Sequence, residues 1–201
     1  MSDSSCAVIV LAAGSSSRMG APKQLLDYQG QPLVRHAAEV ALAAGCGPVI
    51  VVLGSRADEI RPALDGLAVE TIINQRWREG MGTSIQAGLA ALGPRAEAAI
   101  LTLGDQPLVT PEFLRKLREN HAASEHAIVA AWYSGTVGVP ALFARAAFPQ
   151  LLALGGDQGC KGVILKNQAR ATFVDCPEAA LDIDTPDDYQ RIARVGCSAP
   201  G

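Results

Sequence analysis

The sequence has few aromatic residues and no surplus of positive charge. Phe, Trp and Tyr make up 4% of the 201 residues, and 17 Lys and Arg stand against 20 Asp and Glu, for a formal net charge of −3. A protein that binds along nucleic acid needs a basic stripe or patch, which this balance does not favour. We therefore expect no nucleic-acid partner, and a phosphate-bearing ligand would have to be bound by a few local cations.

Cysteine pairs and long apolar runs are also missing. The five cysteines are an odd number and none forms a CxxC pair, which favours reduced thiols over a disulfide or zinc framework. No apolar run reaches the length of a membrane span, and the N-terminus lacks the basic and apolar parts of a signal segment. These features predict a cytoplasmic protein that does not contact a membrane.

The chain does contain a regular alternation of short apolar runs and helical patterns. Apolar runs short enough for buried strands recur at 6–12, 48–53, 70–73, 98–103, 127–132 and 171–174. Helical patterns cover 32–44, 84–92 with Thr83 as the expected N-cap, and 111–121 after Thr110. We predict one domain over residues 1–201, with its core at about 5–195. Its fold class is α/β: a single three-layer α/β/α, Rossmann-like domain with a mostly parallel sheet.

The segment LAAGSSSRMGAPK (11–23) follows the first apolar run and combines small residues with two cations. Gly14 and the serines at 15–17 leave room for a ligand to approach the backbone, whose N–H groups can surround an anion. Arg18 and Lys23 add positive charge where phosphate oxygens would gather. Because ligands of open α/β sheets collect at the carboxyl ends of the strands, the loop predicts a polyphosphate site at that edge.

Two commoner phosphate motifs do not match this loop. A P-loop requires GxxxxGK[ST], but no lysine follows Gly20 and Lys23 precedes Gln24. A dinucleotide fingerprint requires GxGxxG, and Ser16 stands where its second glycine should be. The loop therefore belongs to another class of phosphate-binding sequence.

The segment GDQP (104–107) places a carboxylate at the same edge of the predicted sheet. It follows the apolar run 98–103, so Asp105 should lie beside the phosphate loop. A carboxylate that faces a polyphosphate suits Mg²⁺, a hard cation that binds one or two carboxylates together with phosphate oxygens. From the residues alone two interpretations of Asp105 stay open: a turn aspartate that bonds its own backbone, as is frequent for Asp beside Gly, or a ligand of Mg²⁺.

A second acidic segment, DIDTPDDY (182–189), contains a helix start. Thr185 and Asp188 have the spacing of an N-cap and its partner carboxylate, which explains the later acidic residues structurally. Asp182 and Asp184 precede this cap and are not needed for it. They are therefore free for another role.

The segment EGMGTSIQAGL (79–89) places small and hydroxyl residues at the start of a helix. Gly80, Gly82, Thr83 and Ser84 lie where free backbone donors can bind an anion or the edge of a base. Capping by Thr83 alone would not explain the glycines around it. Trp77 and Trp132 are interpreted as packing residues; because Trp132 ends an apolar run at the predicted active edge, a contact with the substrate is the alternative for it.

The phosphate loop resembles the signature LAxGxSxRMGxxK of the nucleotidyltransferases related to the enzymes that attach a nucleotide to molybdopterin. Alanine at position 13 resembles the cytidylyltransferase branch, because the guanylyltransferase branch usually reads LAGG there. Relatives in the cytidylyltransferase branch commonly have GxPxLF and then GDxGAR. This chain has GVPALF (138–143) and GGDQGCKG (155–162), with Cys160 and Lys161 in place of the Ala-Arg pair. The resemblance covers almost the whole chain.

The resemblance implies a role for each group of residues. The implied nucleotide-binding residues are Leu11, Ala12, Ala13, Gly14, Ser15, Arg18, Lys23, Gly82, Thr83, Ser84 and Gly104. The implied catalytic residues are Arg18, Lys23 and Asp105. The implied Mg²⁺ ligands are Asp105 and Asp184, with Asp182 as the alternative to Asp184. The implied acceptor-binding residues are Gly138, Pro140, Asp157, Gly159 and Lys161.

The reaction that the resemblance implies is transfer of CMP from CTP to the terminal phosphate of molybdopterin or molybdenum cofactor, with release of pyrophosphate. Such a transfer needs alignment and charge neutralisation, and an ionised phosphate nucleophile needs no general base. Two alternatives stay open. One is a nucleotidyltransferase that uses GTP or another phosphorylated acceptor; the other is a non-catalytic protein that binds and delivers molybdenum cofactor, for which a molybdenum hydroxylase would be the client.

Overall fold

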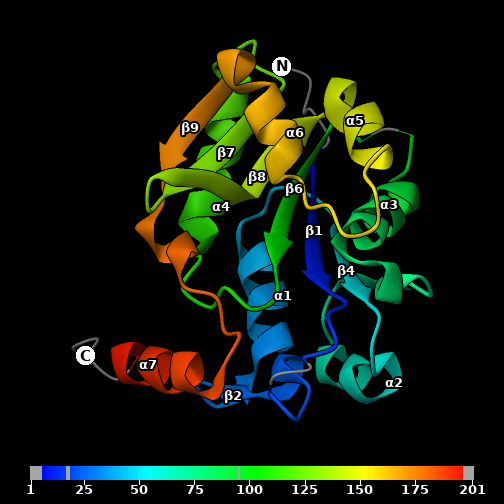
Figure 1. The fold of residues 1–201 in the computed structure, drawn as a ribbon, viewed down its shortest axis with the longest axis vertical. Helices are drawn as coiled ribbons and strands as arrows, with labels where there is room; N and C mark the ends of the chain where they lie inside the picture. The colour runs from blue at the N-terminus through cyan, green and yellow to red at the C-terminus, as the bar shows by residue number, and fades with distance from the viewer. Residues whose placement is uncertain (1–5, 17–18, 95, 197–201) are drawn as a thin grey trace.

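The computed structural model describes residues 6–16, 19–94 and 96–196, which form a central sheet between two layers of helices. The seven strands lie in the order β5-β4-β1-β6-β8-β7-β9 (Figure 1). Their bounds are β1 Cys6–Ala12, β4 Val49–Leu53, β5 Val69–Ile73, β6 Ala98–Leu103, β7 Ile128–Tyr133, β8 Thr136–Ala144 and β9 Ala171–Asp175. All neighbours pair in parallel except β8, which is antiparallel to both β6 and β7. The predicted α/β fold with a mostly parallel sheet is confirmed.

β8 is the one strand of this sheet that the sequence pattern did not predict. Pro140 lies inside it, and a proline normally argues against an interior strand because it has no N–H to donate. The structure accommodates Pro140 at an irregularity in the pairing with β7. There Ala130 pairs with Ala141 while Ala131 pairs with Gly138, so that Pro140 has no partner in the register.

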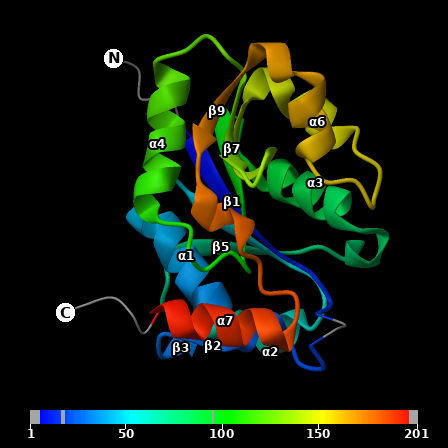
Figure 2. The same ribbon diagram turned by 60° about the vertical axis from the view of Figure 1, so that its left-hand side comes forward.

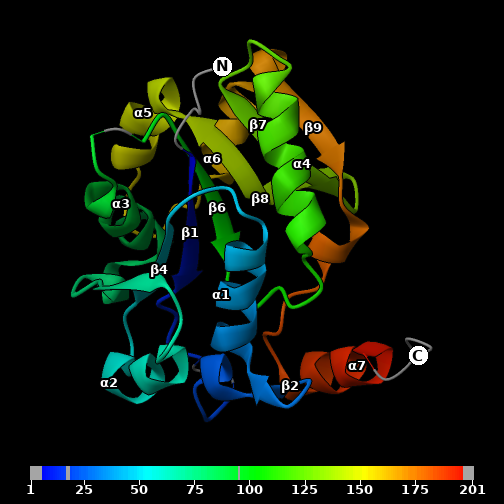
Figure 3. The ribbon, with the colours of Figure 1, turned by 180° about the vertical axis from the view of Figure 1, so that it is seen from behind.

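The two faces of the sheet are covered by different helices. On β1, Val8 and Val10 pack on the side of α1 (Leu33–Ala43) and α4 (Pro111–Ala122), which Figure 3 shows in front. Ile9 and Leu11 pack on the opposite side, against α3 (Met81–Ala91), α5 (Phe148–Leu152) and α6 (Lys161–Lys166). Both faces are therefore buried, which explains why the strands are continuous apolar runs.

The observed starts of two helices correct one prediction and confirm another. α3 begins at Met81 after Gly80, so Thr83 lies inside the first turn and is not the N-cap. The Thr110 side chain accepts a hydrogen bond from the Phe113 N–H and caps α4 as predicted.

None of the described helices has both the length and the apolar character that crossing a membrane requires.

The remaining strands and α-helices lie at the carboxyl ends of the parallel strands. They are the short strands β2 (Asp27–Tyr28) and β3 (Gln31–Pro32) and the helices α2 (Ala57–Ile60) and α7 (Pro186–Gly196). Figure 2 shows α7 next to β2 and β3 at this edge. Thr185 and Asp188 form the predicted capping box of α7: the Thr185 N–H donates to Asp188 Oδ2 at 3.0 Å, and the Asp188 N–H donates to Thr185 Oγ1 at 3.2 Å.

Candidate active site

The loops after β1 and β6 end side by side, because the two strands are parallel neighbours. The Gly104 N–H donates to the Leu11 carbonyl at 3.0 Å, which joins the two loops directly. Beside them lies a cavity of about 440 Å³. It is lined by Leu11, Ala12, Ala13, Gly14, Ser15, Lys23, Gln24, Trp77, Arg78, Gly80, Met81, Ser84, Leu103, Gly104, Asp105, Asp182 and Asp184. The predicted phosphate loop and the predicted metal-binding carboxylates therefore share one cavity.

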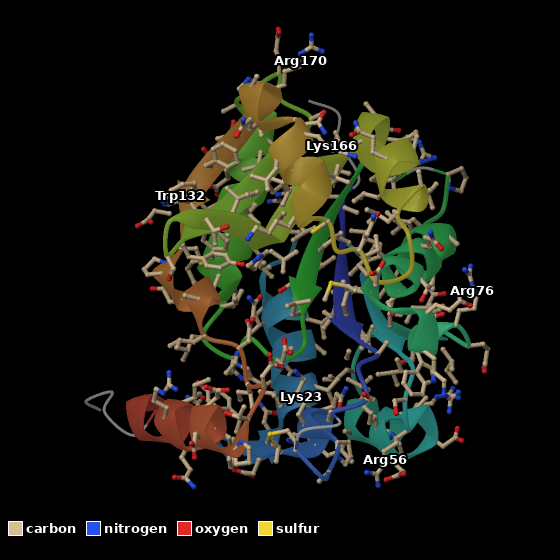
Figure 4. All side chains as sticks on the ribbon, viewed as in Figure 1. Lys23, Arg56, Arg76, Trp132, Lys166 and Arg170 are labelled. Carbon is tan, nitrogen blue, oxygen red and sulfur yellow. The ribbon has the colours of Figure 1, made fainter. Side chains whose placement is uncertain are left out.

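Lys23, which Figure 4 labels, forms ion pairs with two of these carboxylates. Its ammonium is 2.5 Å from Asp105 Oδ2 and 2.7 Å from Asp184 Oδ1, and the Lys23 and Asp105 side chains are only 14% and 18% exposed. Burial by itself would lower the pKa of Lys23. The two carboxylates outweigh burial and raise that pKa above its ordinary value, so the lysine is charged.

The carboxyl-terminal segment reaches this site through a buried isoleucine. Ile183 is fully buried against Tyr28 and Leu33, and its N–H donates to the Asp105 carbonyl at 3.0 Å. Asp182 and Asp184 flank Ile183 and both line the cavity. A residue that the sequence pattern treats as ordinary core thus attaches the two acidic positions to the loop after β6.

The side-chain pKa of Asp182 is raised in this site. Burial, followed by the neighbouring Asp105 carboxylate, raises its pKa from 3.8 to about 6. The Asp184 carboxylate acts in the same direction, whereas Lys23 opposes it. The site therefore holds more negative charge than one lysine balances.

The carboxylates fit a divalent cation. Asp105 Oδ1 is buried, and no group of the described residues donates a hydrogen bond to it. Within the same residues, no three His, Cys, Asp or Glu side chains converge as a complete metal-binding group. The buried Oδ1 without a donor fits a hard cation that takes one or two carboxylates from the protein and its other ligands from phosphates and water.

Gln24 is a site residue that the sequence analysis missed. It is 3% exposed, and its amide donates to the carbonyls of Ala12 (3.0 Å) and Gly14 (2.9 Å). Ser16 Oγ bonds to the Gln24 carbonyl oxygen and accepts a hydrogen bond from the Lys23 N–H. Gln24 thereby holds the phosphate loop against the start of the short 3₁₀ helix Lys23–Leu25. A glutamine next to a lysine gives no sequence signal for this role.

The predicted contacts on α3 divide into one that faces the cavity and two that do not line it. Ser84 lines the cavity. The Gly82 N–H donates to the Gly156 carbonyl at 2.8 Å, and Thr83 Oγ1 lies 2.9 Å from the Gly80 carbonyl, so both are engaged within the protein. Their assignment to the nucleotide stays a prediction.

The predicted acceptor residues also lie outside the lining of this cavity. Gly138 and Pro140 are buried in β8, whereas Asp157 and Lys161 are exposed. A Cβ added at Gly159 would meet Met81 Sδ, a cavity residue, at 3.3 Å. The loop that carries Asp157 and Gly159 thus touches the site from outside, and its acceptor role stays a prediction.

Two further expectations concern the phosphate loop and the tryptophans. Arg18 lies outside the described residues. Trp77 lines the cavity, where the Arg78 guanidinium lies 4.4 Å from the centre of its ring. Trp132 is 42% exposed beside Phe173, away from Lys23 in Figure 4, so the interpretation of Trp132 as a packing residue is wrong.

The cysteines of the described residues do not line the cavity. Four lie in the described residues (Cys6, Cys46, Cys160 and Cys176), and all four are buried and free of disulfide bonds. Burial raises the pKa of Cys160 to about 12, so its thiol is not ionised at neutral pH.

Comparison with known proteins identifies a matching family and several relatives. The model of the MobA-like NTP transferase domain matches residues 8–171. The chain is 29% identical over 182 residues to the molybdenum cofactor cytidylyltransferase of Escherichia coli (strain K12), covering 90% of this chain and 92% of that protein. It is also 29% identical over 197 residues to the nicotine blue oxidoreductase of Paenarthrobacter nicotinovorans, covering 92% and 94%. The bifunctional protein GlmU of Corynebacterium aurimucosum is 37% identical over 130 residues, but the match covers 61% of this chain and only 27% of GlmU.

Solved structures have the same fold over nearly the whole chain. Rv0371c of Mycobacterium tuberculosis H37Rv superposes with a TM-score of 0.86 at 33% identity, covering 96% of this chain and all of that one. A second structure, described as the complex of Rv0371c with manganese, has a TM-score of 0.79 at 31% identity, covering 94% and 98%. A divalent metal in that relative is consistent with the carboxylates described above.

Proposed function

Because the chain belongs to the MobA-like NTP transferase family, we propose that it transfers CMP from CTP to the terminal phosphate of molybdopterin or molybdenum cofactor and releases pyrophosphate. The relative named molybdenum cofactor cytidylyltransferase supports this choice of substrates, and it matches 90% of this chain. Ala13 supports it as well, since that position carries alanine in the branch that uses CTP.

The observation that carries the proposal is the position of Lys23 between Asp105 and Asp184 at the edge of the cavity. The paired carboxylates suit a divalent cation, for which we propose Mg²⁺, and the lysine and loop suit the phosphates that such a cation accompanies. Ions of this kind neutralise charge on a triphosphate and on the pyrophosphate that leaves.

The chain's own residues then have separate tasks. The loop from Leu11 to Ser15, held in place by Gln24, supplies backbone donors for the triphosphate. Lys23 leaves the carboxylates and neutralises charge on the α-phosphate, while Arg18 binds the outer phosphates. No general base is needed, because the attacking phosphate is already ionised.

An oxidoreductase is the alternative that one comparison favours. The relative named nicotine blue oxidoreductase is as similar to this chain as the cytidylyltransferase is. Sequence identity therefore does not decide between an oxidoreductase and a cytidylyltransferase. The carboxylate pair and its lysine favour a metal-bound triphosphate, which is why we propose nucleotidyl transfer.

Release of pyrophosphate tests the proposal. The protein is incubated with molybdopterin, Mg²⁺ and either CTP or GTP, and pyrophosphate is measured with time. We expect release with CTP that depends on both the acceptor and the metal. Asp105→Asn should remove most of this activity in a folded protein, as judged by circular dichroism. Binding of molybdopterin without release of pyrophosphate from either nucleotide would instead support a delivery protein.

A further inference from the structure

Arg78 is a cation on the wall of the cavity that forms no ion pair with a described residue. It lies in the short 3₁₀ helix Trp77–Glu79, directly before α3, and its exposed side chain lines the cavity. The other lining cation, Lys23, is engaged by Asp105 and Asp184. The ion pairs found among the described residues do not include Arg78. Its charge is therefore available to a ligand.

The arginine two positions earlier is placed differently. The Arg76 guanidinium donates to both carboxylate oxygens of Glu79, at 3.0 and 2.6 Å. Its side chain extends outward in Figure 4, and it does not line the cavity. Because Arg76 engages both oxygens of Glu79, the carboxylate next to Arg78 in the sequence does not neutralise Arg78. The two arginines thus differ in role although they share one turn of the chain.

Trp77 connects Arg78 to the phosphate loop. The Arg78 guanidinium lies 4.4 Å from the centre of the Trp77 ring, within the range of a cation–π contact. Trp77 is half-buried and packs against the core cluster that includes Leu11 and Ala13. Gly54, directly after β4, permits this packing, because a Cβ there would meet Trp77 Cβ at 2.6 Å and Ala13 Cβ at 2.8 Å. The ring therefore holds the guanidinium near the loop.

We propose that Arg78, held on Trp77, binds a phosphate group of a substrate in this cavity. A planar guanidinium can bind two phosphate oxygens through parallel N–H groups. The lining also contains three carboxylates, which repel every phosphate that enters (Asp105, Asp182 and Asp184). A cation that no carboxylate engages offsets this repulsion. The inference rests on the proposed function, in which two phosphate-bearing substrates meet: the group belongs either to the triphosphate of the nucleotide or to the terminal phosphate of the acceptor.

Binding measurements distinguish the two sources. Arg78→Gln removes the charge and keeps most of the length of an exposed side chain. Dissociation constants for pyrophosphate, CTP and molybdopterin are measured by isothermal titration calorimetry with Mg²⁺. If the phosphate belongs to the nucleotide, Kd for CTP and for pyrophosphate should rise about tenfold, the value of one hydrogen bond to a charged group. If it belongs to the acceptor, Kd for molybdopterin should rise about tenfold and Kd for CTP should stay unchanged.

Three further variants separate a positioned guanidinium from a general effect of charge. Arg170→Gln is the matched control, because it removes the same charge from an exposed arginine far from Lys23 in Figure 4, and it should change no Kd. Arg78→Lys keeps the charge without the planar group and should recover only part of the lost affinity. Trp77→Leu should weaken the same ligand, and Arg78→Gln should have a smaller effect in its background. If Trp77→Leu does not fold, Trp77→Phe should retain binding.

The results that would overturn the inference are specific. One is an Arg78→Gln protein in which all three dissociation constants equal those of wild type. Another is an equal loss of affinity in Arg170→Gln, which would reduce the effect to net charge. Wild-type affinity in Arg78→Lys would overturn the role given to the guanidinium on Trp77. A wild type whose phosphate binding depends on Arg78 but that transfers no nucleotide would refute the proposed function alone. A wild type that binds none of the three ligands would refute both.

Discussion

Removal of the Lys23 ammonium should destabilise the protein, and a divalent cation should restore the stability that is lost. Lys23→Met keeps most of the length of the side chain and removes only the charge that lies between Asp105 and Asp184. Asp105 is then left as a carboxylate with an 18% exposed side chain and a buried Oδ1 that already has no donor. Asp184 loses less, because its side chain is 54% exposed and water can replace the lysine.

The expected decrease in the free energy of unfolding lies between the values for a surface ion pair and for a buried one. Loss of one partner from a fully buried pair costs about 3–5 kcal/mol, and an exposed pair is worth about 0–1 kcal/mol. With one mostly buried and one half-exposed carboxylate, we expect a loss of about 2 kcal/mol. For a chain of this length, that corresponds to a decrease in Tm of roughly 4–8 °C.

Thermal unfolding at pH 7, with EDTA or with increasing Mn²⁺, measures both parts of the prediction. In wild type the cation must displace an ammonium, whereas in Lys23→Met the carboxylates are free to bind it. Mn²⁺ should therefore raise the Tm of the variant more than that of wild type. Lys166→Met is the matched control, since Lys166 is an exposed lysine at the far end of the molecule (Figure 4).

Two results would refute this reasoning. One is a Lys23→Met protein that unfolds within about 1 °C of wild type in EDTA, which would mean that the ion pairs contribute no net stability. The other is an equal response of both proteins to Mn²⁺, which would mean that Lys23 and the cation do not compete for the same carboxylates. The double variant Lys23→Met/Asp105→Asn supplies an internal check, because removal of both charges should recover most of the lost stability.

Three other predictions test neighbouring parts of the site. The folded-state pKa of Asp182 is raised to about 6, so the stability that its protonated form provides is complete below about pH 4 and is lost as the pH rises through 6. Asp182→Asn should therefore be more stable than wild type by about 1 kcal/mol at pH 8, after allowance for solvent screening, and no more stable below pH 4 in urea unfolding. CTP should be preferred over GTP by kcat/KM, and Ala13→Gly should weaken that preference by ~1–3 kcal/mol without reversing it; a wild type that uses both equally would contradict the role given to this methyl group. A Cβ at Gly82 would overlap the Gly155 carbonyl oxygen, so Gly82→Ala should lower the free energy of unfolding by about 2 kcal/mol, whereas Gly93→Ala, where the space is open, should have little effect.

The sequence by itself determined the layered fold and the edge at which the site lies. Continuous apolar runs such as 6–12 and 98–103 indicate strands buried on both faces, and both form the strands expected. Because parallel strands end at the same edge, the small-residue loop after the first run and Asp105 after the other had to meet there. The capping box of Thr185 and Asp188 is equally local, since its partners are three residues apart. Such patterns can be predicted from the sequence because each depends on a few residues that are neighbours in it.

Only the tertiary structure decided which distant side chains pair and which hydroxyl lines the cavity. Lys23 and Asp184 are 161 positions apart, and they meet because Ile183 is buried and bonded to the Asp105 carbonyl. No local pattern distinguishes Asp184 from Asp182 before that contact exists. The same holds for Asn74, whose amide donates to Ser84 Oγ only after α3 has packed beside the end of β5. The periodicity of a sequence reports which faces are buried, whereas the direction of a hydrogen bond depends on partners that folding brings together.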